Sequence, residues 1–139
     1  PPPPPTPPPP PTTRIECRRQ RQMCIRDSSY QRWQRICLEA CKQSGSAWLP
    51  DLLPMLKPEE VAINACAEGR EVLLAHPGGA ALDVSSDTDK LLMIGPEGGF
   101  TEDEVRRIVA AGATTFSLGQ HILRIETAAV SLLARFRLA

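Results

Sequence analysis

The stretch LLMIGPEGGFTEDEVRRIVAAG, residues 91–112, constrains the fold more than any other part of the chain. An apolar run at 91–94 is followed by a turn with three glycines and one proline, and then by a helical pattern. Thr101 and Glu104 have the spacing of a capping box, and Gly112 is a typical helix end. We therefore predict a buried strand, a tight turn and a helix over this stretch.

The rest of the chain continues this alternation of strands and helices. Apolar residues with helical spacing predict helices over 30–44, from 58 onward and from about 127. Short apolar runs predict strands over 72–77 and 114–119. Buried strands that alternate with helices are typical of a parallel sheet, so the predicted fold class is α/β, with a small parallel sheet and flanking helices.

The predicted helix over 30–44 has one apolar stripe. Trp33, Cys37 and Cys41 lie on this stripe, and Gly45 follows the helix. We expect Trp33 to pack in the core rather than to stack on a base. The five cysteines form no CxxC pair, and no histidine pattern accompanies them. This usage predicts buried thiols in a reducing compartment and no metal site.

The head of the chain, residues 1–28, differs from the rest. Ten of the first eleven residues are proline, which predicts an extended segment without a core, and residues 12–28 are basic without a helical or strand period. We predict that 1–28 is disordered or foreign to the natural protein, and that the domain spans 29–139. The head has a net charge of +3 and residues 29–139 have −3, which argues against a strong nucleic-acid surface on the domain.

The sequence contains no apolar run of about 18 residues and no recognisable signal peptide. We therefore expect a cytoplasmic protein that does not contact a membrane.

Three predicted strands are followed by unusual turns, AHPGG at 75–79, GPEGG at 95–99 and SLGQ at 117–120. In parallel sheets, ligands bind beyond the carboxyl ends of the strands, and glycine lets the backbone approach a ligand closely. Neither GxxxxGK[ST] nor GxGxxG occurs, and the acids at 97 and 102–104 would repel a phosphate. The turns therefore favour a ligand that is cationic or neutral over ATP or NAD.

The segments IGPEGGFTEDE, GATTFSLGQHILRIETAAVSLLA and, more weakly, RWQRICLEACKQSG resemble the RsmE family of ribosomal RNA methyltransferases in the SPOUT superfamily. This resemblance spans roughly residues 29–139. It implies a trefoil-knotted α/β fold, a homodimer, and S-adenosylmethionine held in a bent shape by three loops. On this chain the loops correspond to 76–79, 95–99 and 117–124.

The resemblance also implies which residues surround the methyl donor. Backbone groups of 118–119 and 122–123 would surround the adenine, and Glu97 would balance the sulfonium or orient the amino acid end. The implied donor site consists of His76, Pro77, Gly95, Pro96, Glu97, Gly98, Gly99, Ser117, Leu118, Gly119, Ile122, Leu123, Arg124 and Thr127.

The implied reaction is methylation of N3 of a uridine in the 16S rRNA of the small ribosomal subunit. Uridine N3 is a weak nucleophile until it loses its proton, so we expect Arg124 to stabilise the developing anion and Glu126 to act as a base or to orient Arg124. Alternatives are a SPOUT enzyme that methylates a ribose, a non-catalytic module for RNA binding or dimerisation, and a nucleotide-binding regulator.

The chain departs from the family pattern at several positions. Ile125 stands where the family has Thr, and Lys42 and Ser46 replace an acidic or polar residue and Arg. No RNA-binding β-barrel and no first strand of the catalytic fold is recognisable before Ser29. We therefore predict a partial domain with an unpaired sheet edge and little or no activity of its own.

Overall fold

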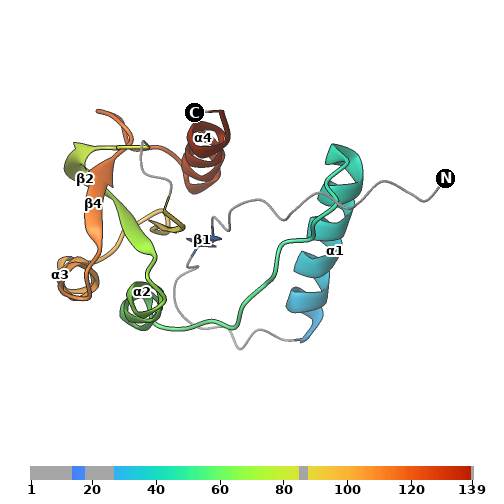
Figure 1. The fold of residues 1–139 in the computed structure, drawn as a ribbon, viewed down its shortest axis with the longest axis horizontal. Helices are drawn as coiled ribbons and strands as arrows, with labels where there is room; N and C mark the ends of the chain where they lie inside the picture. Colours follow the sequence, from blue (N-terminus) through green and yellow to red (C-terminus); the bar gives the residue numbers. More distant parts are fainter. Residues whose placement is uncertain (1–13, 18–26, 85–87, 139) are drawn as a thin grey trace. The chain divides into compact units, whose positions relative to one another are not determined.

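The computed structural model of the chain describes residues 14–17, 27–84 and 88–138. The proline segment predicted at 1–11 lies outside the described residues, as does much of the basic stretch. The chain divides into two units: one contains α1 and the segment that follows it to Met55, and the other contains the sheet and the remaining helices. Figure 1 labels the helices and the strands β1, β2 and β4. The bounds of the elements are α1 Asp27–Ser44, α2 Pro58–Ala67, α3 Glu102–Ala110, α4 Ile125–Leu138, β1 Arg14–Cys17, β2 Glu71–Ala81, β3 Lys90–Ile94 and β4 Thr114–Ser117.

The sheet has four strands in the order β1-β3-β2-β4, and every neighbouring pair is parallel. This arrangement confirms the predicted parallel sheet with flanking helices. We call the end of the sheet at which these strands finish the carboxyl end, and the opposite one the amino end.

The strand β1 corrects a prediction from the sequence. No strand is expected before Ser29, but Arg14–Cys17 pairs with β3 from Leu91 to Ile94. The outer edge of β3 is therefore covered, and the predicted unpaired edge is not present there. Four residues in a basic context are too few to show the alternation that identifies a strand. The predicted domain boundary at residue 28 stays a prediction.

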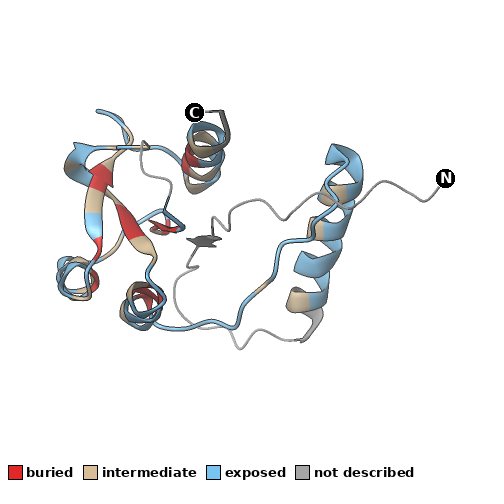
Figure 2. Cartoon of the chain, in the orientation of Figure 1, coloured by how far each residue is buried: buried red, intermediate tan, exposed pale blue. Residues whose placement is uncertain are grey.

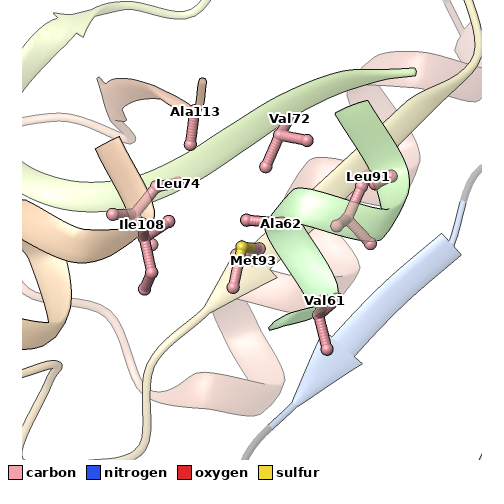
Figure 3. Packing of buried hydrophobic residues seen from close by; sticks show 9 residues of the cluster. Val61, Ala62, Val72, Leu74, Leu91, Met93, Ile108 and Ala113 are labelled. Carbon is pink, nitrogen blue, oxygen red and sulfur yellow. The ribbon is translucent and has the colours of Figure 1, made fainter. Parts of the chain in front are cut away.

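Apolar side chains project from both faces of the sheet, and each face packs against its own hydrophobic cluster. Alternate residues of β2 and β3 pack against α2 and α3 on one face, where Figure 3 shows their side chains meeting. That cluster is Val61, Ala62, Ala65, Val72, Leu74, Leu91, Met93, Ile108 and Ala113. The intervening residues pack with Phe116 and α4 on the other face. The second cluster is Leu73, Leu92, Ile94, Phe116, Ala128 and Leu132.

Burial follows from this two-faced packing. Figure 2 shows buried residues concentrated in the strands, and all five residues of β3 are buried. Strands buried on both faces read as continuous apolar runs, which is why LLMI is a clear signal in the sequence. On one face, α2 and α3 lie side by side, and the Arg107 guanidinium of α3 is 3.4 Å from a carboxylate oxygen of Glu59 on α2.

The predicted helices are confirmed, with shifts at their ends. α1 begins at Asp27 and ends before Gly45, while α4 begins at Ile125, two residues before the predicted start. Within α3, the backbone amide of Glu104 donates to Oγ1 of Thr101, and the amide of Thr101 donates to Oε2 of Glu104. This reciprocal pair confirms the predicted capping box.

The apolar stripe of α1 does not match its prediction. Trp33 is 37% exposed, so its assignment to the core is wrong for the described residues. Cys37 and Cys41 are free and only half-buried rather than fully buried. Inside this unit, the Tyr30 hydroxyl donates to the carbonyl of Leu52, and the thiol of Cys41 donates to the carbonyl of Trp48. These two contacts tie the segment after α1 back to the helix.

Candidate functional site

The three glycine-bearing loops lie at one end of the sheet. Leu74 of β2 pairs with Met93 of β3, and Ala75 of β2 pairs with Phe116 of β4. The residues that follow these pairs are therefore level with one another, and all three strands run in the same direction. The loops at 76–79, 95–99 and 118–124 begin together at the carboxyl end, where open parallel sheets bind their ligands.

The first loop is a bulge inside β2 rather than the end of a strand. β2 pairs with Phe116 at Ala75 and again at Ala80, so residues 76–79 are looped out between two contacts with the same partner. The predicted strand end at Pro77 is therefore wrong, because the chain resumes pairing after the bulge. A Cβ on Gly79 would lie 2.6 Å from the backbone of Phe116, so only glycine fits where the strand returns. His76 is half-buried and Pro77 is exposed.

The second loop is a tight turn that joins β3 to α3. The amide of Gly99 donates to the carbonyl of Pro96 at 2.8 Å, and Gly99 has a φ of 70°. A Cβ on Gly95 would lie 3.2 Å from Gly99 and from the ring of Phe100, so a side chain at this position would crowd the turn. A Cβ on Gly98 or Gly99 would meet nothing within 4 Å. Space is therefore open beside the outer part of this turn.

The side chains of this turn divide by exposure. Pro96 is buried, while Glu97 is exposed, as are both glycines that follow it. The exposed carboxylates of Glu102 and Asp103 lie in the first turn of α3, so negative charge collects beyond the carboxyl end of β3. This distribution disfavours a phosphate and is compatible with a cationic group.

The third loop combines a fixed start with exposed apolar side chains. Oγ of Ser117 donates to the carbonyl of Gly119 at 2.9 Å and accepts from its amide at 3.2 Å. Leu118 is half-buried and packs against the second core cluster, whereas Ile122 is 86% exposed and Leu123 is 36% exposed. The loop therefore places two neighbouring apolar side chains, Ile122 and Leu123, on the surface beyond the carboxyl end of the sheet.

Arg124, Glu126 and Thr127 lie at the start of α4. The carbonyl of Arg124 accepts from the amide of Ala128 at 2.8 Å, which makes Arg124 the N-cap residue, directly before the helix begins at Ile125. All three side chains are exposed. Among the described ion pairs, none joins Arg124 to Glu126. The guanidinium of Arg124 therefore lies beside the third loop without a carboxylate from Glu126 to neutralise it.

The structure thus brings most of the predicted site residues to one end of the sheet, with roles that differ from residue to residue. Gly95, Pro96 and Ser117 are occupied by contacts that shape the loops. Glu97, Ile122 and the first residues of α4 present groups outward. The donor residues that the resemblance implies do not include Gly78 and Gly79, although both lie in the bulge and Gly79 is where the strand returns to Phe116.

The described residues contain no helix of the length and apolarity that crossing a membrane requires. They also contain no group of three or more His, Cys, Asp or Glu side chains arranged to hold a metal ion.

Known proteins resemble this chain over most of its length. A family model described as an RNA methyltransferase domain matches residues 13–137. The ribosomal RNA small subunit methyltransferase E of Synechocystis is 35% identical over 116 residues, which cover 76% of this chain and 37% of that protein.

Two solved structures support the same relationship. A ribosomal RNA small subunit methyltransferase E from Neisseria gonorrhoeae, bound to S-adenosyl methionine, gives a TM-score of 0.74 at 29% identity over 87% of this chain and 52% of that one. A methyltransferase from Legionella pneumophila, in complex with its cofactor SAM, gives 0.72 at 29% identity over 90% and 53%. The chain therefore spans about half the length of these structures, or less than half of the Synechocystis protein. With the matched model covering nearly all of it, the chain belongs to the RNA methyltransferase domain family and is of the RsmE type.

Proposed function

We propose that this chain contributes the methyl-donor site of an enzyme that transfers a methyl group from S-adenosylmethionine to N3 of a uridine in 16S rRNA. The observation that carries the proposal is the convergence of the loops at 76–79, 95–99 and 118–124 at the carboxyl end of the sheet. Membership of the RNA methyltransferase domain family supports the reaction class. The relatives that bind S-adenosyl methionine or SAM support the donor.

The residues at this end of the sheet suit the donor. The space beside Gly98 and Gly99 lets a ligand approach the backbone, and the exposed Ile122 and Leu123 offer apolar surface to an adenine ring. Glu97 is an exposed carboxylate that suits a sulfonium or an ammonium group. When bound, S-adenosylmethionine supplies an electrophilic methyl group.

The chain's own residues would act on the uridine. Deprotonation of N3 places negative charge on the base and its two carbonyl oxygens, and a guanidinium stabilises such charge through two parallel N–H donors. Arg124 is our candidate for this role because it is exposed at the start of α4 beside the third loop. Glu126 is placed two residues later and is proposed as the base or as the group that orients Arg124.

We further propose that the active protein is a cytoplasmic homodimer whose substrate is the small ribosomal subunit. The exposed apolar residues Val130 and Leu133 of α4, together with Ile122, support an interface between copies. The trefoil knot implied by the resemblance remains part of the same proposal.

A substitution pair tests the role of Arg124. Arg124→Ala in the full-length protein should lower methyl transfer to small ribosomal subunits by at least about 100-fold, as for the loss of a donor to a developing anion. Arg135→Ala removes an exposed arginine near the other end of α4 and serves as the matched control, with activity close to wild type. Equal activity of the two variants would remove Arg124 from the mechanism and favour a non-catalytic module.

The position of the new methyl group decides between the proposed reaction and its closest alternative. Mapping the modified nucleotide in 16S rRNA from a deletion strain complemented with the full-length gene should place the methyl on N3 of a uridine. A methyl on a ribose 2′-oxygen, or on a tRNA, would support the ribose methyltransferase instead. Calorimetry tests the third alternative, a nucleotide-binding regulator. Either methyltransferase should bind S-adenosylmethionine, whereas a nucleotide-binding regulator should bind ATP.

We propose that the chain alone turns over slowly. Residues 29–139 carry 11 Lys and Arg against 14 Asp and Glu, so this part attracts RNA weakly. The earlier reason, an unpaired sheet edge, does not hold because β1 covers β3. A methyl-transfer assay should therefore give much higher turnover for a chain with the length of its relatives, and equal turnover would contradict this proposal.

A further inference from the structure

Lys90 is the one charged residue that is buried among the described residues, and the proposed chemistry does not use it. Its side chain is only 4% exposed, at the start of β3. Burial of an ammonium group is unfavourable unless partners replace the lost water. The contacts of Lys90 therefore indicate what its charge does.

Three segments meet the ammonium group of Lys90. Its Nζ donates to the carbonyl of Thr88 at 2.9 Å and lies 3.4 Å from Oε2 of Glu71. It also lies 5.7 Å from the centre of the Phe136 ring, within the range of a cation–π contact. Glu71 of β2 is the residue paired with Lys90 of β3. The ammonium group therefore contacts a carboxylate of the sheet and an aromatic ring of α4.

These contacts fix the far end of the helix that begins at the candidate site. α4 starts at Ile125, directly after Arg124 and beyond the carboxyl end of β4, and brings Phe136 to Lys90 at the amino end of the sheet. The helix has 14 residues and is therefore about 20 Å long. Between its ends, Ala128 and Leu132 pack in the second core cluster, and Ile125 and Ala129 pack against it. Apolar contacts are not directional, so they specify the rotation of a helix less sharply than a buried charge with polar partners does.

We propose that Lys90 is a positioning residue that sets the rotation and axial position of α4 on the sheet, and so places Arg124, Glu126 and Thr127 at the methyl-donor site. This inference rests on the proposed function. A charge held by a carboxylate, a carbonyl and an aromatic ring has one favourable location, whereas an apolar side chain of the same length tolerates several. A site needs its groups held within about 0.5 Å, which the apolar contacts of a single helix do not guarantee.

The test compares four variants of this chain by three measurements. Lys90→Met removes the charge and keeps the length, Lys90→Arg keeps a cation, Phe136→Leu removes the ring, and Glu71→Gln removes the partner charge. We measure the Kd for S-adenosylmethionine by calorimetry, the thermal midpoint of unfolding, and the amide NMR shifts of residues 124–127 without ligand.

We expect Lys90→Met to raise the Kd on the order of tenfold, by analogy with the loss seen when a residue that orients a metal ligand is removed. It should also shift the amides of 124–127 while leaving the thermal midpoint near that of the wild type, because Met removes the buried ammonium and the carboxylate left behind, Glu71, is 38% exposed and can be solvated. Phe136→Leu and Glu71→Gln should change the same amides in part, and Lys90→Arg should stay close to wild type.

Each outcome decides the inference. An unchanged Kd and unchanged amides in Lys90→Met would overturn it and leave the proposed function standing. Failure of the wild-type chain to bind S-adenosylmethionine would overturn the proposed function, and the inference with it. If Lys90→Met does not fold, Glu71→Gln tests the inference instead. Glu71 is 38% exposed, so this substitution leaves the packing of the core unchanged. Wild-type amides at 124–127 in that variant would then count against positioning.

Discussion

The two ends of the sheet are built in opposite ways. At the amino end, Lys90 is buried and its ammonium is held by Glu71, Thr88 and the ring of Phe136. At the carboxyl end, the loops expose Glu97 and Ile122 and leave open space beside several glycines. The buried charge at the amino end has partners within the domain, whereas the side chains of Glu97 and Ile122 at the carboxyl end are exposed to solvent.

This difference separates the residues that stabilise the domain from those that are available to a ligand. Polar groups at the amino end are matched within the fold, so changes there should act on stability or on the placement of α4. The groups at the carboxyl end contribute few contacts, so changes there should act on binding. If this separation holds, substitutions in the core should change the free energy of unfolding most, and substitutions of exposed residues at the carboxyl end should change it least.

The largest effect is expected in the core between the two ends. Leu92 is fully buried in β3, so Leu92→Ala should lower the free energy of unfolding by about 2 to 5 kcal/mol through lost burial and a cavity. Chemical denaturation measures this change. Ile63→Ala is the matched control, because Ile63 of α2 is 54% exposed and its loss should change the value by less than about 0.5 kcal/mol. Similar losses for both would contradict the described packing.

The bulge in β2 is the exception at the carboxyl end. Gly79→Ala should destabilise the protein by about 1 to 3 kcal/mol, because the new Cβ would overlap the backbone of Phe116. Gly98→Ala, where a Cβ meets nothing within 4 Å, should stay within about 0.5 kcal/mol of wild type. The two alanines can be compared by urea denaturation. If Gly79→Ala is as stable as Gly98→Ala, β2 does not return to Phe116 as described.

A smaller loss is expected at the start of α3. Thr101→Ala removes the hydroxyl that caps the amide of Glu104 and should lower stability by about 1 kcal/mol. Thr101→Ser keeps the hydroxyl and should recover most of that loss. The shift in the midpoint of thermal unfolding, measured for the alanine and the serine variant, reports both changes in stability. An alanine variant as stable as the serine variant would show that the cap is energetically silent.

The smallest effect on stability is expected where the surface is most exposed. Ile122→Ser should leave the free energy of unfolding within about 0.5 kcal/mol, since Ile122 is 86% exposed. The same substitution should weaken binding of S-adenosylmethionine or self-association, which calorimetry and light scattering measure. A clear loss of stability with normal binding and association would reverse the proposed division between the two ends.

The sequence predicts the elements whose signals are local. The apolar run of β3, the capping box of α3 and the glycine that ends α1 each depend on neighbouring residues, and the structure confirms all three. The convergence of the three loops also follows from the sequence, because consecutive parallel strands end on the same side of a sheet.

The elements that sequence reasoning misses depend on distant partners. β1 is four residues long and is a strand because β3 offers it an edge, not because RIEC has a pattern. The bulge depends on a second contact with Phe116, which His-Pro-Gly-Gly does not reveal. Lys90 precedes an apolar run in the sequence and has the pattern of an exposed polar residue, whereas in the structure it is buried and its ammonium lies near the ring of Phe136, 46 positions later. The roles of Arg124 and Glu126 stay predictions, since their partner is the substrate.

The way β2 returns to Phe116 has a consequence for how this family can vary. Ala75 and Ala80, which flank the excursion at 76–79, both pair with Phe116 of β4. The number of residues in the excursion is therefore independent of the pairing register between β2 and β4. Residues can be added to or removed from its tip without shifting the register of any strand. Changes in the length of this excursion should therefore alter the rim of the proposed methyl-donor site and leave the strands below it in register.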